Sequence, residues 1–296
     1  MHYDFIPLLP LTLQQGLLYS LAVLGFAFSL RMLAYADLTL EGSFVLGGVV
    51  AAMILREEQS AILSLPTAFI AGGIAGLFTA SQHCFLRINK LLSGIITLAV
   101  LYSLNLRLQE RPNESFYKLK TVFSLIPENT NQLWIIIPVS ILMFGLCWWL
   151  LNTRWGLFLR SCGENEKVVQ KSGYDRRWFI MIGLAFSNAL IALSGCLFSQ
   201  YMGFSDVNIG TSLIVVALTS LMIGEILFRP TTVTGFLLAI LVGSILCQLI
   251  NTICLYINLH PSDHKGIVGI ILIALIYGRY LMAQKQTKKP IGAEVF

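Results

Sequence analysis

Residues 159–174 read Leu-Arg-Ser-Cys-Gly-Glu-Asn-Glu-Lys-Val-Val-Gln-Lys-Ser-Gly-Tyr, a short charged segment between two long apolar stretches. The flanking stretches are residues 132–151 and 179–201, and each has the roughly 20 mostly apolar residues that cross the hydrocarbon core of a bilayer. A charged segment between two such stretches lies on an aqueous side of the membrane. The sequence therefore predicts a helical membrane protein with a polar, helix-forming loop outside the bilayer.

Composition extends this prediction to the whole chain, in which 56% of 296 residues are hydrophobic and 12% are charged. Soluble domains usually carry about a quarter charged residues. We therefore expect an all-α polytopic membrane protein, a single transmembrane domain over residues 1–296, with about nine membrane helices. The apolar stretches are 9–33, 42–55, 61–86, 90–108, 132–151, 179–201, 211–228, 232–257 and 266–283.

Basic residues orient these helices, because Lys and Arg accumulate in cytoplasmic loops. With the N-terminus outside and the C-terminus inside, 14 of the 20 Lys and Arg residues fall on the inner side. The remaining six are Arg56, Arg107, Arg111, Lys118, Lys120 and Lys265. The net charge of +5 then reflects cytoplasmic loops and a basic tail that face anionic lipid, and it requires no nucleic-acid partner.

With this orientation the chain divides into a first half (about 9–108), an outer loop (109–131), a second half (about 132–283) and a cytoplasmic tail (284–296). The outer loop contains prolines and a mixed polar run, so it holds either a short surface helix that binds an extracytoplasmic partner or a solvated connector.

Several chemistries lack the residues that they need. The chain has no G-x-x-x-x-G-K-[ST] motif, so it does not bind ATP through a P-loop. Its six cysteines show no paired spacing and are interpreted as small packing residues. His260, Asp263 and His264 form the best candidate for a metal site, but a simple loop is the favoured interpretation. We expect no catalytic residue, no metal and no cofactor.

Two polar stretches interrupt the apolar pattern, at 37–48 and 206–212. In both, an aspartate leads an alternating polar and apolar run into the start of a helix. Polar groups and irregular backbone at membrane depth are tolerated where protein or a water-filled cavity surrounds them. Paired interruptions of opposite orientation indicate two inverted halves with a transport pathway between them. The candidate pathway residues are Asp37, Thr39, Glu41, Gly42, Ser43, Asp206, Asn208, Gly210, Thr211 and Ser212.

Each polar feature also has a simpler interpretation. Asp37 or Thr39 caps the next helix in an ordinary cytoplasmic turn. Gly72 and Gly76, four residues apart, permit close helix packing within the chain or, alternatively, contact with a second copy. Glu225 acts as a proton relay or, more simply, pairs with a basic residue one turn later, Arg229.

The charged loop predicts a helix of its own over residues 164–172, with its start near Ser161 or Gly163 and its end at Gly173. A short rigid helix between two glycines transmits motion if a partner protein holds it. The alternative is a solvated surface turn.

Arg160-x-x-Gly163-x-Asn165, followed by Ser-Gly-Tyr at 172–174, resembles the cytoplasmic coupling loop of ABC-importer permeases for branched-chain amino acids and simple sugars. Residues 36–44 are similar to the family's first-half signature, and residues 206–210 with Gly224-Glu225 are similar to its second-half signature. Residues 261–266, before the last helix, fit the C-terminal segment of the family. These matches extend over roughly residues 15–283 in the family's order. The chain looks nearest to the branch linked to aromatic amino acids such as tryptophan.

The resemblance implies a multi-pass permease of the bacterial cytoplasmic (inner) membrane, which forms a homodimer on two ATP-binding subunits. It implies that an extracytoplasmic solute-binding protein, often a lipoprotein, delivers a small amphiphilic solute such as an amino acid. It also implies that the ATP-binding subunit contacts Arg160, Gly163, Glu164, Asn165, Glu166, Lys167, Ser172 and Gly173.

The coupling loop departs from the family's pattern at Cys162 and at Val168-Val169, which stand where relatives carry small residues. The alternative function is a secondary transporter driven by an ion gradient. Such a transporter needs carboxylates within the membrane, and Asp37, Glu41 and Asp206 are the available ones.

Overall fold

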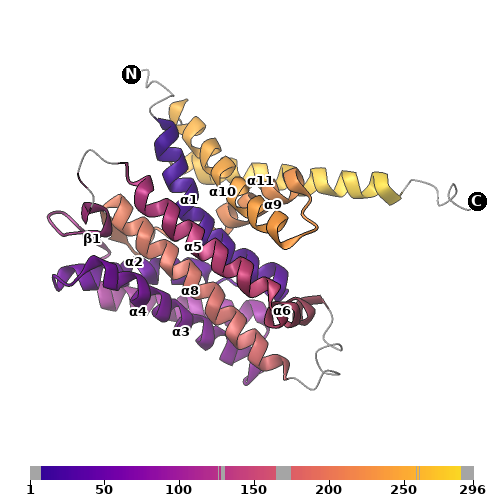
Figure 1. Cartoon of the computed structure of the whole chain (residues 1–296), viewed down its shortest axis with the longest axis horizontal. Helices are drawn as coiled ribbons and strands as arrows, with labels where there is room; N and C mark the ends of the chain where they lie inside the picture. The colour runs from indigo at the N-terminus through magenta and orange to yellow at the C-terminus, as the bar shows by residue number, and fades with distance from the viewer. Residues whose placement is uncertain are drawn as a thin grey trace, which may run out of the picture.

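The computed structural model of the chain is almost entirely α-helical (Figure 1) and describes residues 8–125, 127, 131–164, 175–257, 259 and 261–287. The predicted all-α polytopic membrane fold is confirmed. Six helices in the described part are long and apolar enough to cross a membrane. These candidate spans are Leu8–Met32, Ala61–Cys84, Lys90–Gln109, Leu133–Asn152, Arg176–Met202 and Val233–Tyr256. Nine spans and the N-out orientation stay predictions.

The first half of the chain contains four α-helices and two short helical turns. Helix α1 continues directly into the π-helical turn η1, and the 3-10 turn η2 leads into α3. Their bounds are α1 Leu8–Ala27, η1 Phe28–Met32, α2 Leu40–Arg56, η2 Ala61–Leu63, α3 Ser64–Cys84 and α4 Lys90–Gln109.

The second half contains six described helices, and two strands of three residues each join the halves. The helices are α5 Leu133–Asn152, α6 Arg154–Glu164, α8 Arg176–Met202, α9 Leu213–Phe228, α10 Val233–Tyr256 and α11 Pro261–Thr287. The strands are β1 Asn113–Ser115 and β2 Phe204–Asp206. Side-chain caps begin several helices, since Asn89, Asp175 and Thr232 accept the backbone N–H groups of Leu91, Arg177 and Gly235.

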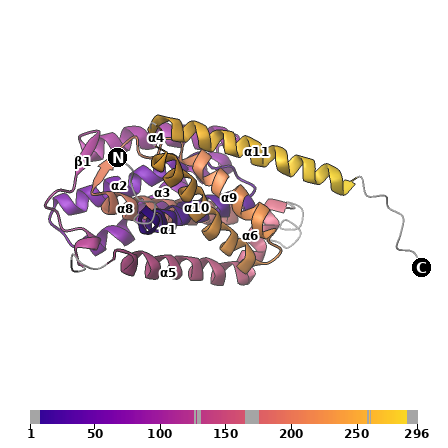
Figure 2. The same cartoon turned by 90° about the horizontal axis from the view of Figure 1, so that it is seen from above.

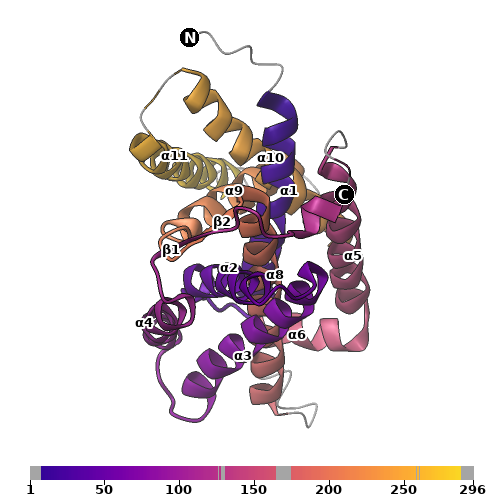
Figure 3. The ribbon, with the colours of Figure 1, turned by 90° about the vertical axis from the view of Figure 1, so that its left-hand side faces the viewer.

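Helix α8 is the centre of the bundle. It packs against α1, α2 and α3, while α10 packs against α1 and α9. Helices α4 and α5 lie on opposite sides of this core, as Figures 2 and 3 both show. Helix α11 contacts α9 and then extends beyond the other helices (Figure 2). The buried core therefore joins helices of both halves.

Glycines allow α8 to approach its neighbours closely. A Cβ atom at Gly47 of α2 would lie 1.8 Å from the carbonyl oxygen of Ala192, and one at Gly195 of α8 would lie equally close to that of Phe44. Gly72 and Gly76 of α3 face α8 in the same way, within 2.4 Å and 2.2 Å of backbone oxygens. The interpretation of this glycine pair as helix packing within the chain is confirmed.

The outer loop, for which the sequence leaves open a short surface helix or a solvated connector, contains a strand. Strand β1 pairs in antiparallel register with β2, with Asn113 opposite Asp206 and Ser115 opposite Phe204. A 3-10 turn, Val122–Leu125, follows, and the described part of this loop contains no α-helix. Pairing with β2 gives hydrogen-bond partners to the backbone N–H and C=O groups of β1, which in a helix would bond to each other.

In the charged segment between α5 and α8, the predicted start of the helix is wrong. The structure has a helix over Arg154–Glu164, so Ser161 and Gly163 lie inside α6 and do not start a helix. Leu159 and Cys162 are buried on one face of α6, and this packing favours a helix before the charged residues. The rest of the predicted helix, residues 165–172, lies outside the described residues.

Candidate functional site

A groove of about 520 Å³ lies between the start of α2, the middle of α4 and the segment that precedes α9. Glu41 and Gly42 line it from the first polar stretch, and Asn208, Gly210 and Thr211 line it from the second. Half of the ten predicted pathway residues therefore meet in one groove, although the two stretches are more than 160 residues apart.

Glu41 ties the two stretches together. Its half-buried carboxylate accepts hydrogen bonds from the backbone N–H groups of Ser212 and Ile214, at the start of α9. Ser212 itself precedes α9 with φ of 72° and makes no side-chain cap. A carboxylate at a helix N-terminus satisfies free donors and complements the helix dipole. Glu41 of the first half thus caps a helix of the second half.

Backbone contacts hold the same region together. A Cβ atom at Gly210 would lie 2.5 Å from the carbonyl oxygen of Glu41, so glycine permits this approach. Asn105 of α4 donates a hydrogen bond of 3.1 Å to the carbonyl oxygen of Gly42. Within the described part of the chain, the side-chain oxygen of Asn105 has no hydrogen-bond partner, although it is buried. Lys265 of α11 attracts the Glu41 carboxylate electrostatically.

The chemistry of the groove is mixed. Tyr102, Ser103 and Asn208 add polar groups, whereas Ile95 and Leu98 add apolar surface. Among the described residues that line it, Glu41 carries the charge. Its volume lies within the roughly 300–1,000 Å³ that is typical of sites for small molecules. The arrangement suits a small molecule with both polar and apolar parts.

Three predicted pathway residues, Asp37, Thr39 and Ser43, do not reach this groove. All three are fully buried and gather around Asn188 of α8. Asn188 donates to Asp37 Oδ2 at 2.7 Å, and its side-chain oxygen accepts from Ser43 at 2.6 Å and from Thr39 at 3.0 Å. Asp37 Oδ1 accepts the backbone N–H of Thr39 at 2.9 Å and also contacts the Thr39 hydroxyl. We call these four residues the Asp37 network.

The Asp37 network lies deep in the bundle. Asn188 is 12 residues beyond the first residue of α8, about 18 Å along the helix at a rise of about 1.5 Å per residue. A surface turn is therefore the wrong interpretation of this stretch. Thr39 precedes α2 but makes no side-chain cap. Sequence reasoning missed Asn188, although an asparagine in the middle of an apolar span is itself a signal of a buried polar contact.

The last two predicted pathway residues, Asp206 and Ser212, shape the second stretch. Asp206 Oδ1 accepts the backbone N–H of Asn208 at 2.7 Å, and its other oxygen lies 3.4 Å from the side-chain nitrogen of Asn113. These contacts hold the turn that brings Asn208 and Thr211 to the groove.

The predicted coupling residues that the structure describes, Arg160, Gly163 and Glu164, lie on α6. Arg160 donates to the carbonyl oxygen of Leu151, at the end of α5. At Gly163, a Cβ atom would lie 2.5 Å from the carbonyl oxygen of Met32, so α6 rests directly on η1. Glu164 ends α6. The other predicted coupling residues, Asn165, Glu166, Lys167, Ser172 and Gly173, lie outside the described residues.

Between these residues lies Cys162, where the loop departs from the family's pattern. Its side chain is buried. Burial raises the pKa of the Cys162 thiol, and the nearby Arg176 guanidinium partly offsets this rise. The thiol is therefore neutral at physiological pH, as a packing residue is.

An ion pair connects η1 to α9. Arg31 of η1 donates to both carboxylate oxygens of Glu225, with a distance of 2.6 Å from Nε to Oε1. The Glu225 side chain is 9% exposed. Sequence reasoning had paired Glu225 with Arg229, whose backbone N–H bonds the Glu225 carbonyl oxygen at 2.9 Å. It missed Arg31 because the two residues are 194 positions apart.

Other candidate sites find little support. Among the described residues, no group of three or more His, Cys, Asp and Glu side chains is placed to hold a metal ion. His260, part of the best sequence candidate for such a site, lies outside the described residues. All six cysteines are free and buried, which agrees with their interpretation as packing residues.

Comparison with known proteins gives matches along almost the whole chain. The family model described as branched-chain amino acid transport system, permease component, matches residues 9–276. A tyrosine transport system permease protein of Clostridioides difficile (strain R20291) is 31% identical over 282 residues, which cover 95% of each chain.

More relatives agree with this result. An uncharacterized protein of Rickettsia prowazekii (strain Madrid E) is 33% identical over 266 residues, or 88% of this chain and 93% of that protein. The ribose import permease protein of Haemophilus influenzae (strain ATCC 51907 / DSM 11121 / KW20 / Rd) is 23% identical over 292 residues, which cover 92% of this chain and 85% of that one. No solved structure matches the chain.

Proposed function

Since the chain belongs to the family of permease components of branched-chain amino acid transport systems, we propose that it forms the membrane pathway of an ATP-driven importer for an amino acid. The groove between α2, α4 and the segment before α9 is the observation that carries this proposal. It unites the two polar stretches that an inverted-repeat transporter places around its substrate.

The substrate is a small amphiphilic amino acid, with an aromatic side chain as the favoured case. The similarity to a tyrosine transport system permease supports this choice. The Glu41 carboxylate fits a substrate with a positively charged amino group, and Ile95 and Leu98 fit an apolar side chain. Asp37, Thr39 and Ser43 act by positioning, since their network holds the start of α2 against α8.

The proposed assembly contains two copies of this chain, two ATP-binding subunits and an extracytoplasmic solute-binding protein, in the bacterial inner membrane. The chain has its N-terminus outside, its C-terminus inside and nine spans. Energy enters through α6 and residues 165–174, which the ATP-binding subunit holds. The contacts of Gly163 with η1 and of Arg31 with Glu225 support a route from this segment to α9.

Two neighbouring positions on α4 test the pathway. Ala99 lines the groove, whereas Val100 is 45% exposed outside it. Ala99→Trp places an indole ring in the groove and should lower uptake by at least about tenfold, the effect of about 1.4 kcal/mol on a rate. Val100→Trp adds the same ring on another face of α4 and should leave uptake within about twofold of the original, since a surface substitution changes stability by about 0.5 kcal/mol.

The assay is uptake of radiolabelled tyrosine, tryptophan and phenylalanine by proteoliposomes that hold the permease, its ATP-binding subunit and its binding protein. Assembly of each variant with the ATP-binding subunit is checked by size-exclusion chromatography. If both assembled variants transport alike, the groove is not the pathway. Uptake that survives ATP depletion and collapses with an uncoupler would instead establish a secondary transporter.

A further inference from the structure

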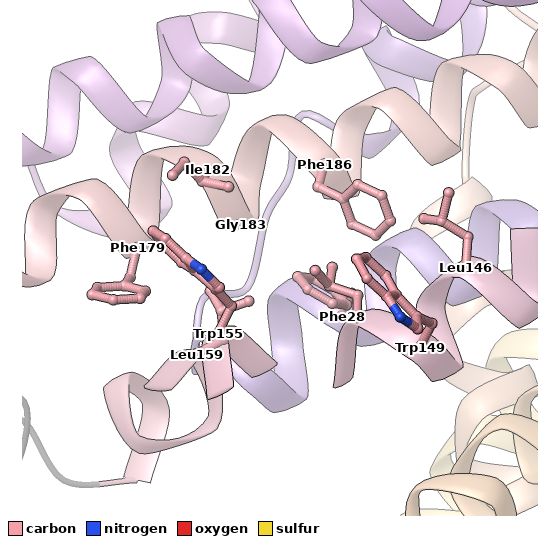
Figure 4. Close-up of a pocket in the computed structure, with 10 residues that line it drawn as sticks. Phe28, Leu146, Trp149, Trp155, Leu159, Phe179, Ile182, Gly183 and Phe186 are labelled. Atoms are coloured by element: carbon pink, nitrogen blue, oxygen red, sulfur yellow. The ribbon is translucent and has the colours of Figure 1, made fainter. Parts of the chain in front are cut away.

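A second cavity, of about 390 Å³, lies between η1, α5, α6 and α8, and its lining is apolar throughout. Figure 4 shows aromatic rings on two sides of this space, with Trp155 and Phe179 on one side and Phe28, Trp149 and Phe186 on the other. We call it the aromatic cavity. None of the described side chains that line it can neutralise an ammonium or a carboxylate group, so a free amino acid does not fit it.

The aromatic cavity opens on the outer surface of the bundle. Trp149 is 64% exposed, Trp155 is 55% exposed and Ile182 is 46% exposed. Helix α5 lies on the side opposite to α4, which borders the groove (Figures 2 and 3). The two cavities therefore face different surroundings. An exposed apolar surface on a spanning helix such as α5 faces the acyl chains of the bilayer.

Tryptophans place the aromatic cavity near the membrane–water interface. Trp148 and Trp149 lie in the last two turns of α5, Trp155 lies at the start of α6, and Trp178 lies in the first turn of α8. All four are at least 46% exposed. Tryptophan gathers at the level of lipid headgroups, where its ring is apolar and its N–H group meets water. Helix α6 joins α5 and α8 at this level.

Positive charge lies beside the aromatic cavity. Arg154 is exposed and directly precedes Trp155, which lines the cavity. In residues 152–164 and 175–183 together there are four arginines and two carboxylates. One of those carboxylates, Asp175, already caps α8 by accepting the N–H of Arg177. A basic rim beside an apolar, membrane-facing cavity matches an anionic lipid headgroup attached to an acyl chain.

We propose that the aromatic cavity binds one acyl chain of an anionic phospholipid, whose headgroup lies against Arg154. The lipid would fill the space between α6 and the body of the bundle, and so support the position of α6 on η1. Its binding is independent of the transported solute, because the cavity and the groove share no residue in the part of the chain that the structure describes.

The headgroup preference is tested first, in a full-length variant that keeps Trp155 as its single tryptophan and carries phenylalanine at the other four positions. The variant is placed in nanodiscs of phosphatidylcholine with increasing mole fractions of brominated phosphatidylglycerol, which quenches nearby indole fluorescence. We expect saturable quenching of Trp155 at a mole fraction about tenfold lower than with brominated phosphatidylcholine, since arginines near the membrane surface attract anionic lipid. Equal, linear quenching by both lipids would overturn the proposal.

Charge variants then locate the headgroup. Arg154→Gln should remove the preference for phosphatidylglycerol. The matched control is Arg107→Gln, an exposed arginine at the end of α4 on the opposite side, which should keep it. If the preference survives in Arg154→Gln, the headgroup does not lie at this arginine and the assignment is wrong.

The acyl-chain position is tested independently in the protein with all of its tryptophans. Ile182→Trp fills the aromatic cavity, whereas Ile141→Trp changes an isoleucine of α5 that is 68% exposed outside it. Native mass spectrometry should show that Ile182→Trp loses one retained phosphatidylglycerol per chain and that Ile141→Trp keeps it. Equal retention in two variants with equal melting temperatures would refute binding in the cavity.

Discussion

Exchanging the two partners of the deepest hydrogen bond in the Asp37 network, as Asp37→Asn with Asn188→Asp, should restore much of the stability that either substitution alone removes. In the native chain, Asn188 Nδ2 donates to Asp37 Oδ2 at 2.7 Å and to the carbonyl oxygen of Leu184 at 3.0 Å. The other hydrogen bonds that the structure describes at the Asp37 carboxylate come from Thr39. The polarity of each contact is therefore fixed by the residue type.

Each single substitution places either two hydrogen-bond donors or two acceptors against each other. In Asp37→Asn, the new amide would direct an N–H group at a donor of either Asn188 or Thr39, and one unsatisfied buried donor costs about 1–3 kcal/mol. In Asn188→Asp, the new carboxylate would direct an oxygen at Asp37 and at the Leu184 carbonyl, so its cost lies at the upper end of that range or above it. In the double variant, the amide at position 37 donates to the carboxylate at position 188. The contact between that carboxylate and the Leu184 carbonyl remains unfavourable, so recovery is incomplete.

The measurement is a double-mutant cycle on the free energy of unfolding of the purified protein in detergent micelles. We expect a coupling energy of about 1–3 kcal/mol that favours the double variant. Hydrogen bonds between membrane helices average only about 0.6 kcal/mol in such cycles, so a value above about 1 kcal/mol requires the burial penalty. Asn152→Asp is the control, because this exposed asparagine of α5 lies outside the network. Additive losses in the double variant would refute the hydrogen-bond assignment.

Two further predictions concern the contacts around η1. Gly163→Ala should separate α6 from η1 by roughly 1 Å, because the new methyl group would contact the Met32 carbonyl. This variant should lower uptake per ATP hydrolysed in proteoliposomes. The control, Gly145→Ala, has open space around its Cβ and should leave that ratio unchanged. Arg31→Ala should lower the melting temperature more than Glu225→Gln, because it takes a charged donor from a carboxylate that is 9% exposed, whereas Arg31 is 37% exposed and keeps contact with water in Glu225→Gln. The expected cost is about 1–3 kcal/mol. If Gly163→Ala leaves uptake per ATP hydrolysed unchanged, the contact between α6 and η1 does not couple transport to ATP hydrolysis. If Arg31→Ala and Glu225→Gln have equal melting temperatures, the expected cost of removing the Arg31 guanidinium is wrong.

Length and apolarity were enough to predict most helices. The predicted stretch 90–108 corresponds to α4 at Lys90–Gln109, and 232–257 corresponds to α10 at Val233–Tyr256. Apolar stretches of this length have few alternatives in a bilayer, because each backbone polar group must be satisfied within the helix. The two polar stretches were also visible in the sequence, since such residues interrupt an otherwise apolar pattern, and their role as a pathway stays a prediction.

Contacts between helices that are distant in the sequence could not be predicted from the sequence pattern. Arg31 lies 194 positions from Glu225, and Asn188 lies 151 positions from Asp37, whereas periodicity reports only on neighbours within a helix. The first polar stretch also contains both buried residues and residues that line the groove, and their spacing in the sequence does not distinguish them. Asp37 is fully buried in the segment before α2 begins, whereas Glu41, four residues later in the first turn of α2, lines the groove.

Helix α6 was missed at its start for a local reason. A Cβ at Gly156 would lie 2.5 Å from Leu151, because the chain turns sharply between α5 and α6. A glycine next to arginine and tryptophan resembles a loop in the sequence. Burial of Leu159 and Cys162 against the bundle outweighs this local preference, as tertiary packing often does for helix propensity.

Helix α9 is where the contacts of both halves converge. Near its C-terminal end Glu225 is bound by Arg31, and at its N-terminal end the free N–H groups of Ser212 and Ile214 are bound by Glu41. A helix of 16 residues is about 24 Å long and moves as a rigid element. We therefore expect a displacement of η1 by α6 to reach the turn before α9 that carries Asn208 and Thr211, which line the groove. The π-helical geometry of η1 leaves its backbone less regular than the α-helices on either side. We therefore expect η1 to change shape more readily than α8 and its tightly packed neighbours.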